Sequence, residues 1–236
     1  FGIKDNFYND SLNSYITSLN QKVSKLFEKH EGCFFIDSIN IVAKIGEQYF
    51  YDPVRAISFS APYSMTGLKA FSLEISKFIR ASHGRTKKCI ICDCDNTLWV
   101  GVVGESSLDE LKIGKSSFPD KAFIEFQVFL KQLSEKGILV ALCSKNNEED
   151  VWNVFENHKE MILSKEDISI VKINWNNKAE NIKEIANDLN LGLDSFVFVD
   201  DSDFECNLVR DTLTEVAVVQ VSKNPLSAIK EIIHHG

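Results

Sequence analysis

The stretch KCIICDCDNTLWVGVVGE, residues 88–105, decides the fold. Its run CIIC has the pattern of a strand that is buried on both faces, and the chain turns directly afterwards into the acidic loop DCDNT. A charge that follows a fully apolar strand needs a strong compensating partner, because burying it alone is costly. Asp93 and Asp95 are therefore the first candidates for functional residues.

Downstream of this strand, apolar segments alternate with helical ones. Further strands are predicted at ILVALCS (138–144), SIVKINW (169–175), SFVFVDD (195–201) and EVAVVQV (215–221). Each is followed by a segment with helical periodicity, which is typical of βαβ units. The sequence thus predicts an α/β protein, with a Rossmann-like parallel sheet covered by helices on both faces. Only one helix fits between successive strands, so no large cap domain is expected.

Residues 1–86 have a different pattern and predict a small α+β segment before a catalytic domain at residues 87–236. Helices are expected at 10–30 and 64–84, and short strands at CFFIDSINIVAKIG (33–46) and QYFYDP (48–53). The polar, basic stretch GRTKK (84–88) is the expected connector.

Composition excludes several classes of protein. The chain has 236 residues, 44% of them hydrophobic, with a net charge of -8, so an anionic nucleic-acid backbone is not an expected partner. It contains no apolar run of membrane-spanning length, and its first residues lack the pattern of a signal peptide. Most of the six cysteines lie in apolar runs and are expected to be reduced, which favours a cytoplasmic protein.

Polar residues recur where the predicted strands end. Because the carboxyl ends of parallel strands meet at one edge of a sheet, these residues are expected to form one site. They are Asp93, Asp95, Ser144, Lys178, Asp200 and Asp201. Clustered carboxylates suit Mg²⁺, which prefers oxygen ligands. A hydroxyl group and a lysine suit the oxygens of a phosphate, so Ser144 and Lys178 are the predicted phosphate-binding residues.

The motifs resemble those of a known superfamily. DCDNT (93–97) is similar to the first motif, Asp-x-Asp-x-Thr, of the haloacid dehalogenase (HAD) superfamily, and the later motifs follow in order as a Ser, a Lys and paired acids. DNTLWVGVVGE, LCSKNNEEDV, INWNNKAENI and LGLDSFVFVDDS look like the FkbH-like branch (subfamily IIIC). The resemblance covers about residues 87–222. The preceding segment resembles the end of an SGNH-hydrolase-like region, without its nucleophile block, which implies a packing remnant or a docking segment.

This resemblance implies roles for the site residues. Asp93 would be the nucleophile that forms an aspartyl-phosphate, and Asp95 would be the general acid and base. The carboxylates of Asp93 and Asp200 and the backbone carbonyl of Asp95 would bind Mg²⁺. Asp201 would be either a water-mediated metal ligand or the partner that orients Lys178. Core packing is the expected role of Trp99 and Trp175, which flank the motifs.

The reaction and the role of Cys143 stay open at this stage. FkbH-like enzymes load a glyceryl group from 1,3-bisphosphoglycerate onto an acyl carrier protein, so Cys143, next to Ser144, is a candidate catalytic thiol that carries the acyl group. The alternative is a packing residue, since neighbours on a strand face opposite sides. A second reaction to consider is hydrolysis by an uncapped phosphatase, acting on a phosphorylated small molecule or a phosphoprotein. A third possibility is a non-catalytic phosphate-binding scaffold.

Overall fold

The computed structural model describes residues 12–30, 32–33, 35–84, 86–114, 120–222 and 225–235. The chain divides into two compact units, Phe1–Gly84 and Arg85–Gly236. No helix among these described residues is long and apolar enough to cross a membrane. The first two residues of the helix predicted at 10–30 lie outside the described residues.

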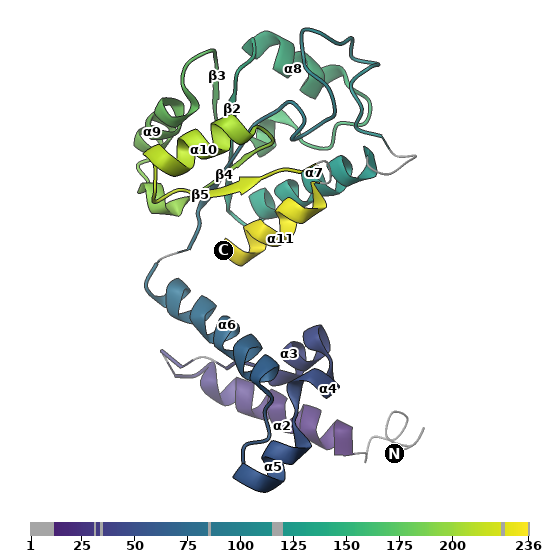
Figure 1. Ribbon diagram of the computed structural model, residues 1–236, viewed down its shortest axis with the longest axis vertical. Helices are drawn as coiled ribbons and strands as arrows, with labels where there is room; N and C mark the ends of the chain where they lie inside the picture. The colour runs from purple at the N-terminus through teal and green to yellow at the C-terminus, as the bar shows by residue number, and fades with distance from the viewer. Residues whose placement is uncertain are drawn as a thin grey trace. The chain divides into compact units, whose positions relative to one another are not determined.

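As the sequence predicts, the second unit is built on a parallel sheet (Figure 1). Its five strands lie in the order β3-β2-β1-β4-β5. The strands are β1 (Cys89–Cys92), β2 (Leu139–Ser144), β3 (Ile170–Ile173), β4 (Phe196–Asp200) and β5 (Ala217–Gln220). β1 lies at the centre, and its Cys92 pairs with Leu142 of β2 and Val199 of β4. The next residues along these strands therefore emerge together at the carboxyl edge of the sheet.

Helices cover both faces of this sheet. They are α7 (Asp120–Glu135), α8 (Glu148–Asn157), α9 (Lys178–Asp188), α10 (Asp203–Thr212) and α11 (Leu226–His235), with the short 3-10 turns η1 (Lys165–Asp167) and η2 (Leu193–Ser195). Buried side chains of α7, α8 and α11 pack on one face, against alternate strand residues such as Ile90 and Cys92. Those of α9 and α10 pack on the other, against Cys89 and Ile91. This alternation explains why the strands are apolar at nearly every position.

Local signals place the helices that border the site. α9 begins directly at Lys178 because the side chain of Asn177 accepts a hydrogen bond from the backbone N–H of Ala179. α10 begins after Ser202, whose hydroxyl accepts from the N–H of Glu205. Both caps lie a few residues after a strand end, so each helix starts at the carboxyl edge of the sheet.

The described part of the first unit is helical. It contains α2 (Leu12–Phe27), α3 (Ser38–Ile45), α4 (Glu47–Phe50), α5 (Pro53–Phe59) and α6 (Met65–Ser82). The two strands predicted at 33–46 and 48–53 are wrong. α3 lies within the first segment, and α4 and the start of α5 occupy most of the second, where an isolated bridge joins Tyr51 to Tyr63. The side chain of Asp37 caps α3 by accepting from the N–H of Ile39, and this cap outweighs the β-branched composition of the segment.

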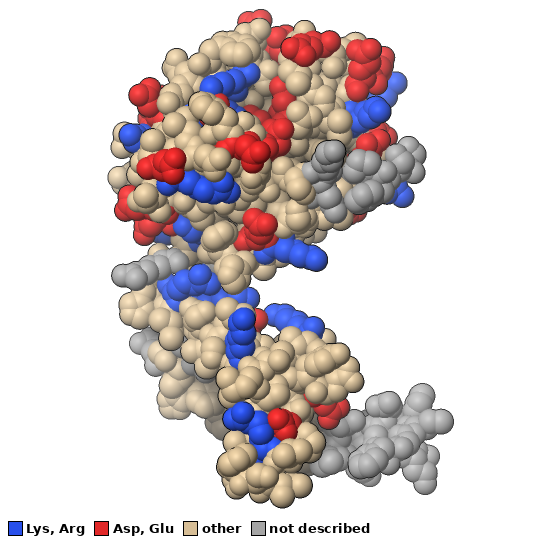
Figure 2. Space-filling view, viewed as in Figure 1, with Lys and Arg blue, Asp and Glu red and all other residues tan. Residues whose placement is uncertain are grey.

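α6 crosses α4 at a glycine. A Cβ atom added at Gly67 would lie 2.5 Å from the backbone oxygen of Phe50, which is itself fully buried. A large share of the exposed apolar side chains of the chain belong to this unit, among them Tyr15, Ile57 and Phe59. Most of its visible described surface is accordingly uncharged in Figure 2, whereas both signs of charge intermingle on the second unit.

Candidate functional site

A buried lysine joins two buried carboxylates at the carboxyl edge of the sheet. The Nζ atom of Lys178 lies 2.8 Å from Oδ1 of Asp93 and 2.7 Å from Oδ2 of Asp200. The hydroxyl of Ser144 donates to Oδ1 of Asp93 at 2.7 Å. All four side chains are buried. The structure thus brings together residues from four separate strand ends, as their sequence positions predict.

Burial shifts the ionisation of this cluster. Burial and, after it, the nearby charge of Asp93 raise the pKa of Asp200 to about 7, against the opposing effect of Lys178. Burial alone would lower the pKa of Lys178, but the charges of Asp93 and Asp200 hold it above its ordinary value. Lys178 therefore stays charged, while Asp200 holds its proton more firmly than an ordinary aspartate does.

The carboxylate of Asp95 accepts a separate set of hydrogen bonds. Its Oδ1 accepts hydrogen bonds from the indole N–H of Trp99 at 2.9 Å and from the backbone N–H of Val103 at 3.1 Å. Its Oδ2 accepts from Nδ2 of Asn146 at 3.0 Å. Burial raises the pKa of Asp95 above its ordinary value, although these three donors oppose the shift. A half-buried carboxyl group that is held by three donors and holds its proton more firmly than usual suits a general acid.

Three carboxylates form a possible metal site. Asp93, Asp200 and Asp201 each offer an oxygen atom, and these atoms lie within 4.8 Å of one another. Burial also raises the pKa of Asp201, and the charge of Asp93 adds to the effect. The carboxylates outnumber the one ammonium group beside them, and an all-oxygen donor set suits a hard divalent ion such as Mg²⁺. The residues present therefore fit the predicted cation.

Cys143 lies on the opposite face of its strand from Ser144. Its thiol is fully buried in the cluster that β2 shares with α9, and its Sγ atom is 4.0 Å from the backbone oxygen of Lys178. Burial raises the pKa of the Cys143 thiol to about 12. A thiol in this position is protonated at neutral pH, which supports the packing alternative left open by the sequence.

Several contacts around the site are not predicted by the sequence. Asn146 donates to Asp95 and also to the Ser144 hydroxyl, each at 3.0 Å. Trp99 is fully buried, as expected, but its N–H also holds Asp95. The core packing predicted for Trp175 is wrong, since this side chain is 70% exposed. The sequence shows that SKNN, residues 144–147, ends β2 and begins the next loop. Only the folded structure shows that Asn146, among these residues, contacts Asp95.

A second ion pair borders the site. The Nζ atom of Lys145 lies 2.6 Å from Oε1 of Glu205, a buried residue in the first turn of α10. Lys145 directly follows Ser144, so this pair ties the loop after β2 to the helix after β4. No sequence signal pointed to it, because the two residues are 60 positions apart.

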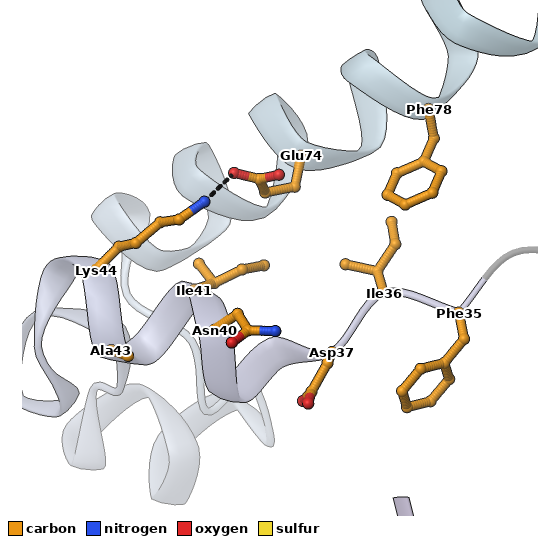
Figure 3. Close-up of a pocket in the computed structure, with 9 residues that line it drawn as sticks. All are labelled: Phe35, Ile36, Asp37, Asn40, Ile41, Ala43, Lys44, Glu74 and Phe78. Carbon is orange, nitrogen blue, oxygen red and sulfur yellow. Dashed lines mark hydrogen bonds and ion pairs between the residues drawn. The ribbon is translucent and has the colours of Figure 1, made fainter. Parts of the chain in front are cut away.

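The first unit has a pocket of its own, between α3 and α6 (Figure 3). Its volume is about 560 Å³, and its lining combines apolar side chains such as Phe35, Ile41 and Phe78 with polar ones. Lys44 and Glu74 face one another across it, with 3.0 Å between Nζ and Oε1. The Lys44 side chain is mostly exposed and that of Glu74 is partly buried, so the ion pair contributes little stability and mainly links α3 to α6.

Comparison with solved structures identifies the architecture. The N-terminal part of a Bacteroides fragilis protein, containing a phosphatase domain and solved as a complex with Mg, is 34% identical to this chain and superposes with a TM-score of 0.87. The match covers 100% of this chain and 63% of that one. The fold is HAD-like. With 63% coverage, this chain spans less than two thirds of the length of that neighbour.

Other structural neighbours are more distant. A HAD-family enzyme from Bacteroides thetaiotaomicron, in complex with magnesium and inorganic phosphate, is 13% identical, with a TM-score of 0.41 over 58% of this chain and 95% of that one. A deoxy-D-mannose-octulosonate 8-phosphate phosphatase from Haemophilus influenzae is 12% identical, with a TM-score of 0.42 over 63% and 75%. These two add nothing to the first likeness. No family model matches the chain, and neither does any curated protein sequence.

Proposed function

We propose that this chain is a magnesium-dependent HAD-type phosphatase that removes the phosphoryl group of a phosphorylated small molecule through an aspartyl-phosphate on Asp93. The observation that carries the proposal is the buried arrangement of Asp93, held by Lys178 and Ser144 beside Asp200 and Asp201. The likeness to a phosphatase domain solved with Mg supports it. Bound Mg²⁺ would offset the negative charge of the acids and of the phosphoryl group, so that a carboxylate can approach phosphorus.

Each step then belongs to a residue of the chain. A carboxylate oxygen of Asp93 forms a bond to phosphorus as the bond to the leaving oxygen breaks. Lys178 and Ser144 place a positive charge and a hydroxyl group beside that carboxylate, where the oxygens of the phosphoryl group arrive. Asp200 keeps the lysine in place through its second short contact.

Asp95 moves the proton. Because its pKa is raised by burial, it can enter the reaction protonated and donate its proton to the leaving oxygen. As a carboxylate it then takes a proton from the water that attacks the aspartyl-phosphate, which releases inorganic phosphate and restores Asp93. The donors Trp99, Val103 and Asn146 hold the carboxyl group in one orientation through the cycle.

Glyceryl transfer from 1,3-bisphosphoglycerate to an acyl carrier protein is the second candidate function. It is supported by the resemblance to the FkbH-like branch and by short connections in the sheet, since one α-helix and one 3-10 turn separate β2 from β3 and β3 from β4. A large acceptor such as the arm of a carrier protein can reach an open site of this kind. With Cys143 buried and protonated, the acyl group would pass directly to the thiol of the carrier.

The test of the phosphatase proposal is the turnover of acetyl phosphate with Mg²⁺ and with a chelator. We expect Mg²⁺-dependent release of phosphate, and a loss of about 10³-fold or more in Asp93→Asn. The matched control is Asp109→Asn, an exposed loop acid, which should keep its activity. Residual turnover of Asp93→Asn within tenfold of the unmodified protein, about 1.4 kcal/mol, would refute the nucleophile assignment. Incubation with 1,3-bisphosphoglycerate and carrier proteins, followed by intact mass, tests the transfer alternative.

A further inference from the structure

A groove with a volume of about 490 Å³ opens between the start of α8 and the loop that joins β3 to α9. Its lining comprises Asn146, Asn147, Asn174, Trp175 and the acids of the first turn of α8, together with Ile173. The proposed reaction uses only Asn146 among these residues. The other groups have no role in the reaction, so the composition of the groove needs a separate explanation.

The indole of Trp175 is exposed but held in place. Its side chain is 70% exposed, and its N–H lies 3.5 Å from Oδ1 of Asn147. The preceding residue, Asn174, exchanges side-chain amide hydrogen bonds with Asn181 of α9 at 2.9 and 3.3 Å, and it accepts from the N–H of Asn176 at 2.9 Å. Asn174, directly before the tryptophan, is thus fixed to α9, and Asn176, directly after it, is bonded back to Asn174. A large aromatic face held open to solvent in a groove is a platform for a ligand.

Asn146 links the groove to the phosphoryl site. It lines the groove and also donates to Asp95 and Ser144, both at 3.0 Å. On the other side, the backbone N–H of Asn174 donates to the carbonyl oxygen of Ser144 at 3.0 Å. A substrate whose phosphoryl group lies against Asp93 and Ser144 would therefore have Asn146 beside it, and its substituent could extend along the groove toward Trp175.

The chemistry of the lining selects the substituent. Side-chain amides offer both donors and acceptors, which matches the hydroxyl groups of a polyol. The face of the indole suits the C–H groups of such a chain or ring. Glu148, Glu149 and Asp150 add three negative charges, which disfavour a second phosphate or a carboxylate. These acids lie in the first turn of α8, where the helix dipole favours them, so they need no bound cation.

We propose that this groove binds the leaving group of the substrate, and that this group is an uncharged polyhydroxyl chain or ring such as that of a sugar or polyol monophosphate. The proposal rests on the proposed function, since it takes the phosphoryl site at Asp93 as the anchor. Trp175 is the residue that would contact the hydroxylated group directly and set its preference over smaller or anionic substituents.

The kinetic test compares sorbitol 6-phosphate with acetyl phosphate. We expect Trp175→Ala to lower the ratio of the two kcat/KM values about tenfold, mainly through the KM for sorbitol 6-phosphate, because a stacking contact is lost. The control is Ile233→Ala, which removes a 53% exposed apolar side chain from α11 and should leave the ratio unchanged. An unchanged ratio in Trp175→Ala would overturn the proposal.

A binding test separates this proposal from the phosphatase assignment. In Asp93→Asn with Mg²⁺, sorbitol 6-phosphate should change the tryptophan fluorescence, and adding Trp175→Phe should abolish that change. 3-Phosphoglycerate should bind at least about tenfold more weakly. Equal binding of 3-phosphoglycerate, tighter binding of phosphocholine, or a signal that persists without Trp175 would each overturn the polyol assignment. If Asp93→Asn still turns over acetyl phosphate, the phosphatase mechanism fails while the binding result stands.

Discussion

Replacing Lys178 by Met should strongly destabilise the metal-free protein. Lys178 is buried and is the cation between two buried carboxylates, Asp93 and Asp200, at 2.8 and 2.7 Å. Methionine keeps most of the apolar stem of the side chain, so packing changes little while the charge is lost. The two acids then face one another without the cation that lies between them.

The expected loss follows from that geometry. Removing one partner of a buried ion pair costs about 3–5 kcal/mol, because the remaining charge is left uncompensated. The loss should not exceed this range, since Asp200, whose pKa is already raised to about 7, can take up a proton instead of remaining charged. Against a typical folding stability of about 5–15 kcal/mol, such a change is large.

The assay is urea unfolding in a chelator, followed by tryptophan fluorescence, because all three tryptophans lie in the second unit. The matched control is Lys172→Met, since Lys172 also contacts two acids, Glu184 and Asp188, at 2.9 and 3.1 Å. Those acids are more than half exposed, so its loss should cost no more than about 1 kcal/mol. Equal losses in the two variants would refute the reasoning.

Three further predictions concern other parts of the chain. Iodoacetamide at pH 7.5 should label the exposed Cys33 in the native protein and spare Cys143, which is buried and has a pKa of about 12. Peptide mapping would locate the label, and fast labelling of Cys143 would contradict its burial. Gly67→Ala should destabilise the first unit by about 1–3 kcal/mol at the helix crossing, while Ser72→Ala on the exposed face of α6 should be neutral by circular dichroism. Asn146→Ala should lower kcat for acetyl phosphate by about tenfold or more, because Asp95 loses a donor, and an unchanged kcat would exclude that role.

The sheet was predictable because its signals are strong and repeated. Five apolar runs alternate with helical segments, and the structure confirms a parallel sheet with helices on both faces. The meeting of Asp93, Ser144, Lys178 and Asp200 followed from strand ends alone, since parallel strands share one carboxyl edge. Their chemical roles stay predictions, because geometry places groups without showing turnover.

The remaining features could not be predicted, because they depend on contacts between residues that are far apart in the sequence or on small local preferences. α3 is a short segment with β-branched residues, which favour a strand, and with an N-cap at Asp37, which favours a helix. The free-energy difference between these two local preferences is small, so the sequence pattern does not decide between them. The exposure of Trp175 depends on where the loop is anchored by Asn174 and Asn181, which lie on different elements. The inward turn of Asn146 likewise depends on Asp95, 51 positions earlier in the chain.

The central claim, an aspartyl-phosphate on Asp93, is tested most directly by chemical trapping. The protein is mixed with acetyl phosphate and Mg²⁺, quenched, and reduced with borohydride, which converts an aspartyl-phosphate to homoserine. Peptide mapping should then find homoserine at position 93, dependent on both acetyl phosphate and Mg²⁺, and unmodified aspartate at position 95. Homoserine at another position, or none at position 93 while phosphate is released, would contradict the account.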